Sequence, residues 1–254
     1  MWAQRVVLIT GASSGLGRAL ASELGGRGAA LGLLARRAEA LAAVVGEVEA
    51  AGGRALALPA DVRDAAAVRA AAEGLGARFG PVDVLVANAG VGGQVGGAQF
   101  DAEDLGEVLG VNVVGAANAV AAVLPEMRAR RGGQLVAISS LAAYRGLPKS
   151  AAYCASKAAL TAMFESLRLD LKDTGVDVTI IHPGFIKTPL TATRHARMPY
   201  LMELSDATQK IVRAIEQRRK LYAFPWPLAG LVRLGLVMPA WMYDPIALRN
   251  SFRE

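Results

Sequence analysis

Cysteine and histidine are scarce in this chain, and their scarcity limits the chemistry it can use. The single cysteine, Cys154, excludes a disulfide within the chain and favours a reducing compartment, so we expect a cytoplasmic protein. Only two histidines, His182 and His195, are present, and we assign no metal ligands. A charged start followed by a long apolar stretch is also missing, and we therefore expect no signal peptide.

Linkers, repeats and low-complexity segments are absent as well. The 254 residues suit one large domain, which we expect to span residues 1–254. Hydrophobic residues make up 53% of the chain and charged residues 20%, so a large core can form. The net charge of +6 suits an anionic ligand. Because the basic residues form no stripe interleaved with aromatic ones, we predict no binding to nucleic acid.

Short apolar runs alternate with helical patterns along most of the chain. The runs predict strands at 5–10, 30–35, 54–60, 82–88, 134–140, 176–184 and 221–224. The main helical patterns cover about 16–27, 102–130, 152–173 and 205–219. This alternation predicts the α/β class, a Rossmann-like doubly wound parallel sheet with helices on both faces. In such sheets ligands bind beyond the carboxyl ends of the strands.

A glycine-rich turn follows the first predicted strand. Gly11, Gly15 and Gly17 are spaced G-x-x-x-G-x-G, which matches neither G-x-G-x-x-G nor a Walker A motif. Glycines let the backbone approach a phosphate, and the next helix offers free N–H groups at its start. The same residues also spell G-x-S-x-G, with Ser13 as a hydrolase nucleophile. We disfavour that alternative because a nucleophile elbow should follow several strands.

An acidic residue is missing after the second strand, where dinucleotide folds use one to bind the adenine ribose. Arg36 and Arg37 stand there instead. An arginine at this place accommodates the extra phosphate of NADP, and its guanidinium can bind phosphate through two hydrogen bonds. The alternative is an ordinary charge pair at a helix start. With the glycine turn nearby, we predict NADP as the cofactor, with NADPH preferred over NADH.

A serine, a tyrosine and a lysine mark the stretch that we expect to carry the chemistry. Tyr153 and Lys157 are four residues apart, so they share one face of a helix. A free phenol has a pKa near ~10, and a cation within about 4–6 Å lowers it by roughly 1–3 units. Ser140 would hydrogen-bond the same substrate oxygen. Alone, a Tyr-x-x-x-Lys face also arises by chance; together with the glycine turn it predicts a proton-transfer device.

These motifs together resemble the short-chain dehydrogenase/reductase family, over about residues 5–188. The resemblance is carried by T-G-A-S-S-G-L-G at 10–17, D-V at 61–62, A-N-A-G at 87–90, N-V at 112–113, Ser140, Y-C-A-S-K at 153–157 and P-G-F-I-K-T at 183–188. Ala87 departs from the family, which often has a second asparagine there. This change does not affect the chemistry.

The resemblance implies a role for each matching residue. Tyr153 would be the acid or base, Lys157 would tune it and bind the nicotinamide ribose, and Asn112 would anchor a water that leads protons to Lys157. Asp61 and Val62 would border the adenine, and Ile186 and Thr188 would hold the nicotinamide carboxamide. The full set of expected cofactor-binding residues is Gly11, Ser13, Ser14, Gly15, Leu16, Gly17, Arg36, Arg37, Asp61, Val62, Asn88, Ala89, Gly90, Tyr153, Lys157, Pro183, Gly184, Ile186 and Thr188.

The substrate site is less well defined by the sequence. We expect an apolar pocket formed by Leu141, Tyr144, Leu147 and Phe185. Residues 189–202 are too irregular for a core element and fall where the family places a substrate lid, with apolar residues at Leu190, Met198, Tyr200 and Leu201. A plain connecting loop is the alternative. The apolar character predicts a hydrophobic substrate rather than a sugar.

An apolar C-terminal extension covers residues 225–254. It is apolar around almost the whole helix and is interrupted by prolines and by Arg233. It can be a lid helix, a subunit interface or a membrane anchor with Trp226 and Trp241 at the headgroups. We favour burial within the protein or within a homo-oligomer, a dimer or tetramer, because large apolar patches are rarely left exposed. Peripheral membrane contact is the less favoured alternative.

The expected function is therefore hydride transfer between a nicotinamide cofactor and a carbonyl or secondary alcohol. The direction is not encoded in the sequence. The rival is a catalytically inactive nucleotide-binding sensor or scaffold of the same fold. The intact set of Asn112, Ser140, Tyr153 and Lys157 argues against that rival, because such a protein need not keep proton-transfer groups.

Overall fold

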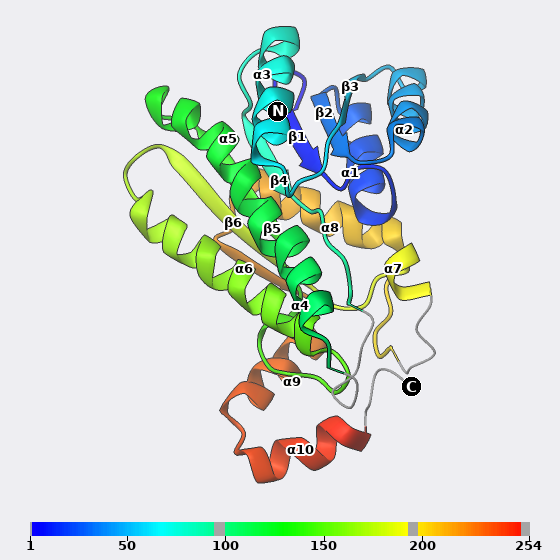
Figure 1. Ribbon diagram of the computed structural model, residues 1–254, viewed down its shortest axis with the longest axis vertical. Coiled ribbons are helices and arrows are strands. Elements are labelled where there is room, and N and C mark those ends of the chain that lie inside the picture. The colour runs from blue at the N-terminus through cyan, green and yellow to red at the C-terminus, as the bar shows by residue number, and fades with distance from the viewer. Residues whose placement is uncertain (1, 94–99, 193–197, 250–254) are drawn as a thin grey trace.

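The computed structural model describes residues 2–93, 100–192 and 198–249, and Figure 1 shows its elements in chain order. The strands are β1 (Val6–Thr10), β2 (Ala30–Ala35), β3 (Arg54–Pro59), β4 (Val84–Ala87), β5 (Gly133–Ile138), β6 (Val176–Pro183) and β7 (Leu221–Phe224). The α-helices are α1 (Gly15–Gly26), α2 (Ala38–Ala50), α3 (Ala65–Phe79), α4 (Ala102–Leu109), α5 (Gly115–Ala129), α6 (Ala151–Asp170), α7 (Pro189–Ala192), α8 (Leu204–Glu216), α9 (Trp226–Val237) and α10 (Ala240–Arg249).

The seven strands form one parallel sheet in the order β3-β2-β1-β4-β5-β6-β7. The strand order reverses between β1 and β4, so the loops after these two strands lead away in opposite directions. Such a switch point leaves a crevice at the carboxyl ends of the strands. The predicted doubly wound α/β fold is confirmed.

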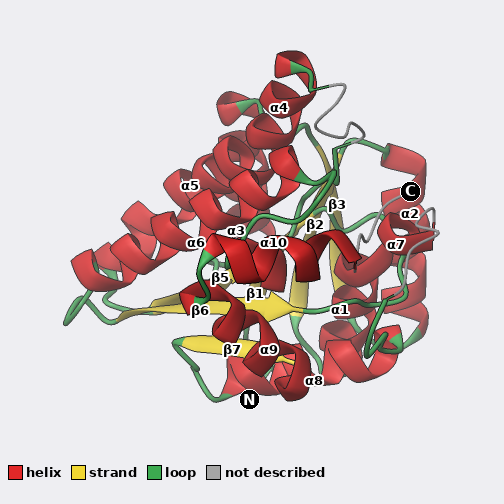
Figure 2. Ribbon diagram, turned by 90° about the horizontal axis from the view of Figure 1, so that it is seen from below, coloured by secondary structure: helices red, strands yellow, loops and turns green. Residues whose placement is uncertain are grey.

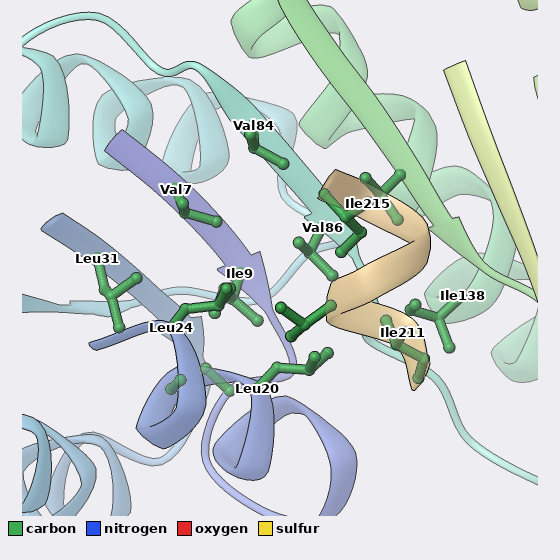
Figure 3. Packing of buried hydrophobic residues seen from close by; sticks show 14 of the residues in the cluster. Val7, Ile9, Leu20, Leu24, Leu31, Val84, Val86, Ile138, Ile211 and Ile215 are labelled. Atoms are coloured by element: carbon green, nitrogen blue, oxygen red, sulfur yellow. The ribbon is translucent and has the colours of Figure 1, made fainter. Parts of the chain in front are cut away.

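Helices cover both faces of the sheet, as Figure 2 shows, and a hydrophobic cluster holds them there on each face. Successive residues of a strand point to opposite faces, so Val7 and Ile9 pack under α1 and α8, whereas Val6 and Leu8 belong to the cluster under α3, α5 and α6. Figure 3 shows the first cluster, where Leu20 of α1 and Ile211 of α8 approach the strands. Because both faces are covered, the central strands are apolar without alternation.

The helix predicted over 102–130 contains a wider turn. A π-helical segment, η2 (Gly110–Val114), separates α4 from α5 and carries Asn112. The stretch Ala102–Ala129 is long and apolar enough to cross a membrane by length and composition, yet 44% of its most apolar window is buried. It packs against α3 and α6, as a core helix does.

The C-terminal extension forms two helices, α9 and α10, which we call the hood (residues 226–249). In Figure 1 the hood forms the lower end of the molecule. Small residues of α9, such as Ala229 and Gly235, are buried, whereas the side chains of Trp226, Leu236 and Val237 are more than half exposed. Residues 250–254 of the extension and 193–197 of the predicted lid lie outside the described residues.

Candidate active site

A pocket of about 800 Å³ opens at the carboxyl ends of the strands. It extends from the glycine turn after β1, past the ends of β2, β4, β5 and β6, to the hood. One continuous space therefore joins the expected cofactor residues to the expected catalytic and substrate residues.

The glycine turn has a backbone that side chains would disrupt. Gly11 and Gly15 have φ of +67° and +52°, a region that favours glycine. A Cβ on Gly11 would lie 2.7 Å from Ala89 Cα, and one on Gly17 would lie 2.3 Å from the Gly11 carbonyl oxygen. The turn is therefore packed tightly against the loop after β4, and the start of α1 faces the pocket. This cradle fits a pyrophosphate, which needs close backbone approach and free N–H groups.

Thr10 and Asn88 fasten the two loops of the switch point together. Thr10 Oγ1 accepts hydrogen bonds from the backbone N–H groups of Asn88 and Ala89, each at 3.0 Å. The Asn88 amide donates back to the Thr10 carbonyl at 2.9 Å and to the Gly11 carbonyl at 3.3 Å. The side chain of Asn88 thus holds the first residues of the glycine turn in place through their carbonyl groups.

Two exposed arginines and one aspartate surround the end of the pocket near β2 and β3. Arg36 and Arg37 line it, and Arg37 Nη2 donates to Ser13 Oγ at 3.1 Å. Asp61 is held by Arg63 at 2.7 Å, and this hydrogen bond lowers the pKa of the Asp61 carboxyl. Because Asp61 is paired, Arg36 and Arg37 leave this end with a positive charge that suits an anion.

Ser140, Tyr153 and Lys157 line the centre of the pocket. Ser140 follows β5 and accepts a hydrogen bond from Ala142 N at 3.1 Å. Tyr153 and Lys157 lie one turn apart on α6, and the Lys157 ammonium is 5.9 Å from the centre of the Tyr153 ring. Lys157 Nζ donates to the Ile138 carbonyl at 2.8 Å. Burial lowers the pKa of Lys157 to about 8, so the ammonium is still the main form at pH 7.

Asn112 lies behind the pocket and is fully buried. Its Oδ1 accepts from Val91 N at 2.8 Å, and its Nδ2 donates to the Val91 carbonyl at 3.0 Å and to Ser156 Oγ at 2.9 Å. Ser156 in turn donates to the Tyr153 carbonyl at 2.8 Å. Asn112 therefore braces the loop after β4 against the turn of α6 that carries Tyr153. π-turns often occur at such functional positions.

A buried polar chain runs from the same helix toward the hood. Ser139 Oγ lies 2.8 Å from Thr161 Oγ1, which lies 3.2 Å from His182 Nε2. The rings of Tyr144 and His182 are 4.9 Å apart, and the Arg233 guanidinium lies 5.9 Å from the Tyr144 ring centre. Burial, and then the positive charges of Arg233 and Lys157, lower the pKa of His182 to about 4.

This pKa predicts a loss of stability in acid. The folded state binds the His182 proton only near pH 4, whereas the unfolded chain binds it near pH 6.5. Stability from neutral His182 is therefore present above pH 6.5 and is lost as the pH falls toward 4, by roughly 3 kcal/mol. We expect His182→Gln to flatten this decline in urea unfolding between pH 7 and 4.5. An equally steep decline in the variant would contradict the assignment.

Most of the residues predicted for the site line the pocket, although their binding roles stay predictions. The pocket wall contains Gly11, Ser13, Ser14, Gly15, Leu16, Arg36, Arg37, Asp61, Val62, Asn88, Ala89, Gly90, Ser140, Leu141, Leu147, Tyr153, Lys157, Pro183, Gly184, Phe185, Ile186 and Thr188. Gly17 and Asn112 stand behind the wall.

Tyr144 was predicted to line the pocket, and the structure places it elsewhere. It packs beneath α9 in a small cluster with Leu141 and Leu228, and its ring lies at a tilt against that of His182. Of the apolar residues expected in the lid, Leu190 lines the pocket, whereas Met198, Tyr200 and Leu201 do not. The backbones of Phe185 and Lys187 hydrogen-bond with that of Met202, which ties the chain just before this segment to the segment's last residue.

Arg145 and the inner side of the hood also line the pocket. The sequence left a lid helix open as one alternative for the C-terminal extension but assigned none of these residues to the pocket. The hood residues in the wall are Leu228, Leu231, Val232, Leu234, Gly235, Met238, Tyr243, Ile246 and Ala247. A helix that is apolar on all sides has no unique buried face, so its pattern cannot tell which side meets a ligand.

The comparisons with known proteins agree with the fold and the motifs. The family model for the short chain dehydrogenase matches residues 5–199. An uncharacterized oxidoreductase of Myxococcus xanthus (strain DK1622) is 44% identical over 96% of this chain and 97% of its own length. The ketoacyl reductase HetN of Nostoc sp. (strain PCC 7120) is 32% identical over 84% of this chain and 76% of its own.

A solved structure adds a cofactor to the comparison. A short chain dehydrogenase/reductase from Burkholderia phymatum, in complex with NAD, superposes with a TM-score of 0.84 at 28% identity. The match covers 100% of this chain and 98% of that one. With the sheet order, the glycine cradle and the Ser140, Tyr153 and Lys157 group, these matches show that the chain is an enzyme of the short-chain dehydrogenase/reductase family.

Proposed function

We propose that this chain is an NADP(H)-dependent oxidoreductase that transfers a hydride between the nicotinamide and a carbonyl or secondary alcohol of a hydrophobic substrate. The observation that carries this proposal is the shared pocket. The glycine cradle, Arg36, and the Ser140, Tyr153 and Lys157 side chains all open into it. A cofactor and a substrate bound there would meet beside Tyr153.

A nicotinamide cofactor would supply or accept the hydride at the carbonyl carbon. Tyr153 gives a proton to the carbonyl oxygen in reduction and takes it in oxidation. The Ser140 hydroxyl donates to the same oxygen and fixes its position, while its own oxygen stays bonded to Ala142 N. Lys157 presents its charge below Tyr153, which favours the phenolate, and binds the nicotinamide ribose hydroxyls.

The proposed function is tested by turnover. Purified enzyme would be incubated with NADPH and a panel of aldehydes and ketones, and the absorbance of NADPH followed. Oxidation of NADPH by apolar carbonyl compounds is expected. Tight binding of NADPH without turnover of any member of the panel, or of the matching alcohols with NADP, would instead favour a nucleotide-binding sensor.

The preference for NADP rests on Arg36 and Arg37. Hydrogen bonds to charged groups contribute roughly 1.5–3 kcal/mol, or about 10- to 150-fold in affinity. We therefore expect Arg36→Asp to weaken NADPH binding by about this factor and to change NADH binding little. A double variant, with Arg36→Asp and Arg37→Asp together, removes both guanidinium groups that could bind the phosphate. Binding would be measured by cofactor fluorescence.

A control variant separates this effect from a general loss of positive charge. Arg78 lies in the last turn of α3, outside the pocket, so Arg78→Asp should leave both affinities unchanged. Equal Km values for NADH and NADPH in the unmodified enzyme would rule out the proposed preference.

We also propose that the enzyme assembles as a homo-oligomer, a dimer or tetramer. The exposed apolar outer side of the hood supports this assembly, because such surface is rarely left in water. Of the basic residues that would attract an anionic membrane, Arg218, Arg219 and Lys220 precede β7, at the other end of this strand from the hood, and Arg233 lies in α9. Light scattering without detergent measures the assembly.

A further inference from the structure

The hood lies outside the part of the chain that matches the family model, which ends at residue 199. It nevertheless lines the pocket, together with Leu141, Leu147 and Phe185. In Figure 1 the hood stands apart from the layers that hold the sheet. This wall therefore lies beyond the part of the chain that the family model describes.

The space below the hood is lined mainly by apolar side chains. Among the described residues in the pocket wall, Asp61 is the one acid, and it lies at the opposite end, near β3. Next to the hood, Arg145 is the charged residue among those described in the wall. A polar substrate would lose its hydration here without gaining hydrogen bonds, whereas transfer of an alkyl chain from water into this space lowers the free energy.

The rim of this space is apolar as well. Leu231, Leu234 and Ile246 line the pocket and are also 59%, 58% and 48% exposed. The wall therefore continues to the surface without a polar border at these residues. The far end of a long chain can extend to the rim while its carbonyl end lies beside Tyr153.

Arg145 holds this wall in place. Its Nη1 donates to the carbonyls of Gly235 and Met238, the latter at 2.6 Å, so it caps the end of α9. Its guanidinium also lies 3.9 Å from the centre of the Tyr243 ring in α10. Tyr243 donates its hydroxyl to the Gly146 carbonyl at 2.6 Å. The loop that begins at Ser140 is thus bonded to both helices of the hood.

We propose that the space below the hood binds the apolar chain of the substrate, and that Arg145 is the positioning residue that keeps the hood over it. The substrates of this class are long-chain aliphatic ketones or aldehydes and the matching alcohols. This proposal rests on the proposed function, because it assumes that the reacting carbonyl lies beside Tyr153.

Methyl ketones of increasing length test the chain-binding site. With 2-butanone, 2-octanone and 2-dodecanone as substrates and NADPH as cofactor, kcat/KM should rise about fourfold for each methylene that the site buries. This factor corresponds to about 0.8 kcal/mol per methylene. The rise should level off where the chain passes the rim. A kcat/KM that does not change with length would overturn the proposal.

Two leucines of α9 give a matched pair of variants. Leu234 lines the pocket, whereas Leu236 does not, and their exposed fractions are 58% and 54%. Leu234→Asn should lower kcat/KM for 2-dodecanone by at least tenfold and leave 2-butanone within about twofold. Leu236→Asn should leave both unchanged. Equal effects of the two variants would contradict the assignment of the inner wall.

The role of Arg145 is tested by Arg145→Met. We expect KM for 2-dodecanone to rise by at least tenfold while kcat with 2-butanone stays within about threefold. Amide hydrogen exchange over 226–249 should become faster, with exchange over 151–170 unchanged. Tyr243→Phe keeps the ring beneath Arg145 and loses one hydrogen bond, so its effect should be smaller. Unchanged exchange in the hood of Arg145→Met would refute the positioning role.

A binding measurement separates failure of this inference from failure of the proposed function. If no ketone of any length is reduced, the function is wrong, and the chain site is judged by binding alone. The Tyr153→Phe protein with NADPH would then be heated with 2-butanol or 2-dodecanol. A larger rise in melting temperature with 2-dodecanol, lost in Leu234→Asn, supports the site. Equal shifts overturn it.

Discussion

Replacing Tyr153 by phenylalanine should abolish turnover while cofactor binding stays within a few-fold. The substitution removes one hydroxyl at the centre of the pocket and leaves the ring beside Lys157. General acid–base catalysis contributes about 10²- to 10⁴-fold to a rate, so kcat should fall by at least this factor. Steady-state kinetics with the best carbonyl substrate measure kcat, and fluorescence titration measures NADPH binding.

A second tyrosine provides the control. Tyr222 lies on β7, outside the pocket, and Tyr222→Phe removes the same hydroxyl with no expected effect on kcat. Retention of more than a few per cent of kcat in Tyr153→Phe would exclude Tyr153 as the acid or base.

Replacing Lys157 by methionine should damage both the rate and the affinity for cofactor. We expect kcat/KM at pH 7 to fall by at least 100-fold, because Tyr153 loses the charge that favours its phenolate. We expect the Kd for NADPH to rise about 10- to 150-fold, the range that corresponds to a lost hydrogen bond from a charged group. Kinetics and cofactor titration of the same preparation measure both.

Stability distinguishes this effect from misfolding. Methionine fills nearly the same space, and burial already disfavours the ammonium of Lys157, whose pKa is lowered to about 8. The free energy of unfolding should therefore not decrease. Lys172→Met changes an exposed lysine just beyond α6 and should behave like the unmodified enzyme. Normal NADPH binding in Lys157→Met would contradict the ribose role.

The fold was predictable because its central strands are buried on both faces. The apolar run Ala30–Ala35 forms β2 with the expected bounds, and it is buried throughout. Helix ends were less predictable. The helix expected to reach residue 173 ends at Asp170, and Asp173 and Gly175 then adopt positive φ. Such a turn stops a helix, but the apolar periodicity that predicts helices does not register it.

The site was predictable where the motif fixes the backbone, and less so where packing decides. Gly11 and Asn88 are close because the ends of β1 and β4 adjoin in the sheet. Tyr144 and Arg145 are neighbours in the loop after Ser140, and of the two Tyr144 was expected to line the pocket. The aromatic ring packs on His182 instead, and the arginine lines the pocket because the end of α9 needs a donor.

The π-helical turn at 110–114 offsets α5 from α4 around the axis of the long helix. Each residue of an α-helix advances about 100° around the axis. The extra residue that a π-turn accommodates therefore offsets the residues of α5 by about this angle, compared with an uninterrupted α-helix. A single period of 3.6 residues therefore does not describe the apolar positions of α4 and α5 together. Val108 is the buried residue of α4, which packs against α6, whereas Ala116 and Val120 are buried in α5, which packs against α3. A single helical wheel drawn over 102–129 would therefore put the residues of either α4 or α5 at the wrong angle. Asn112 lies in the turn between the two helices.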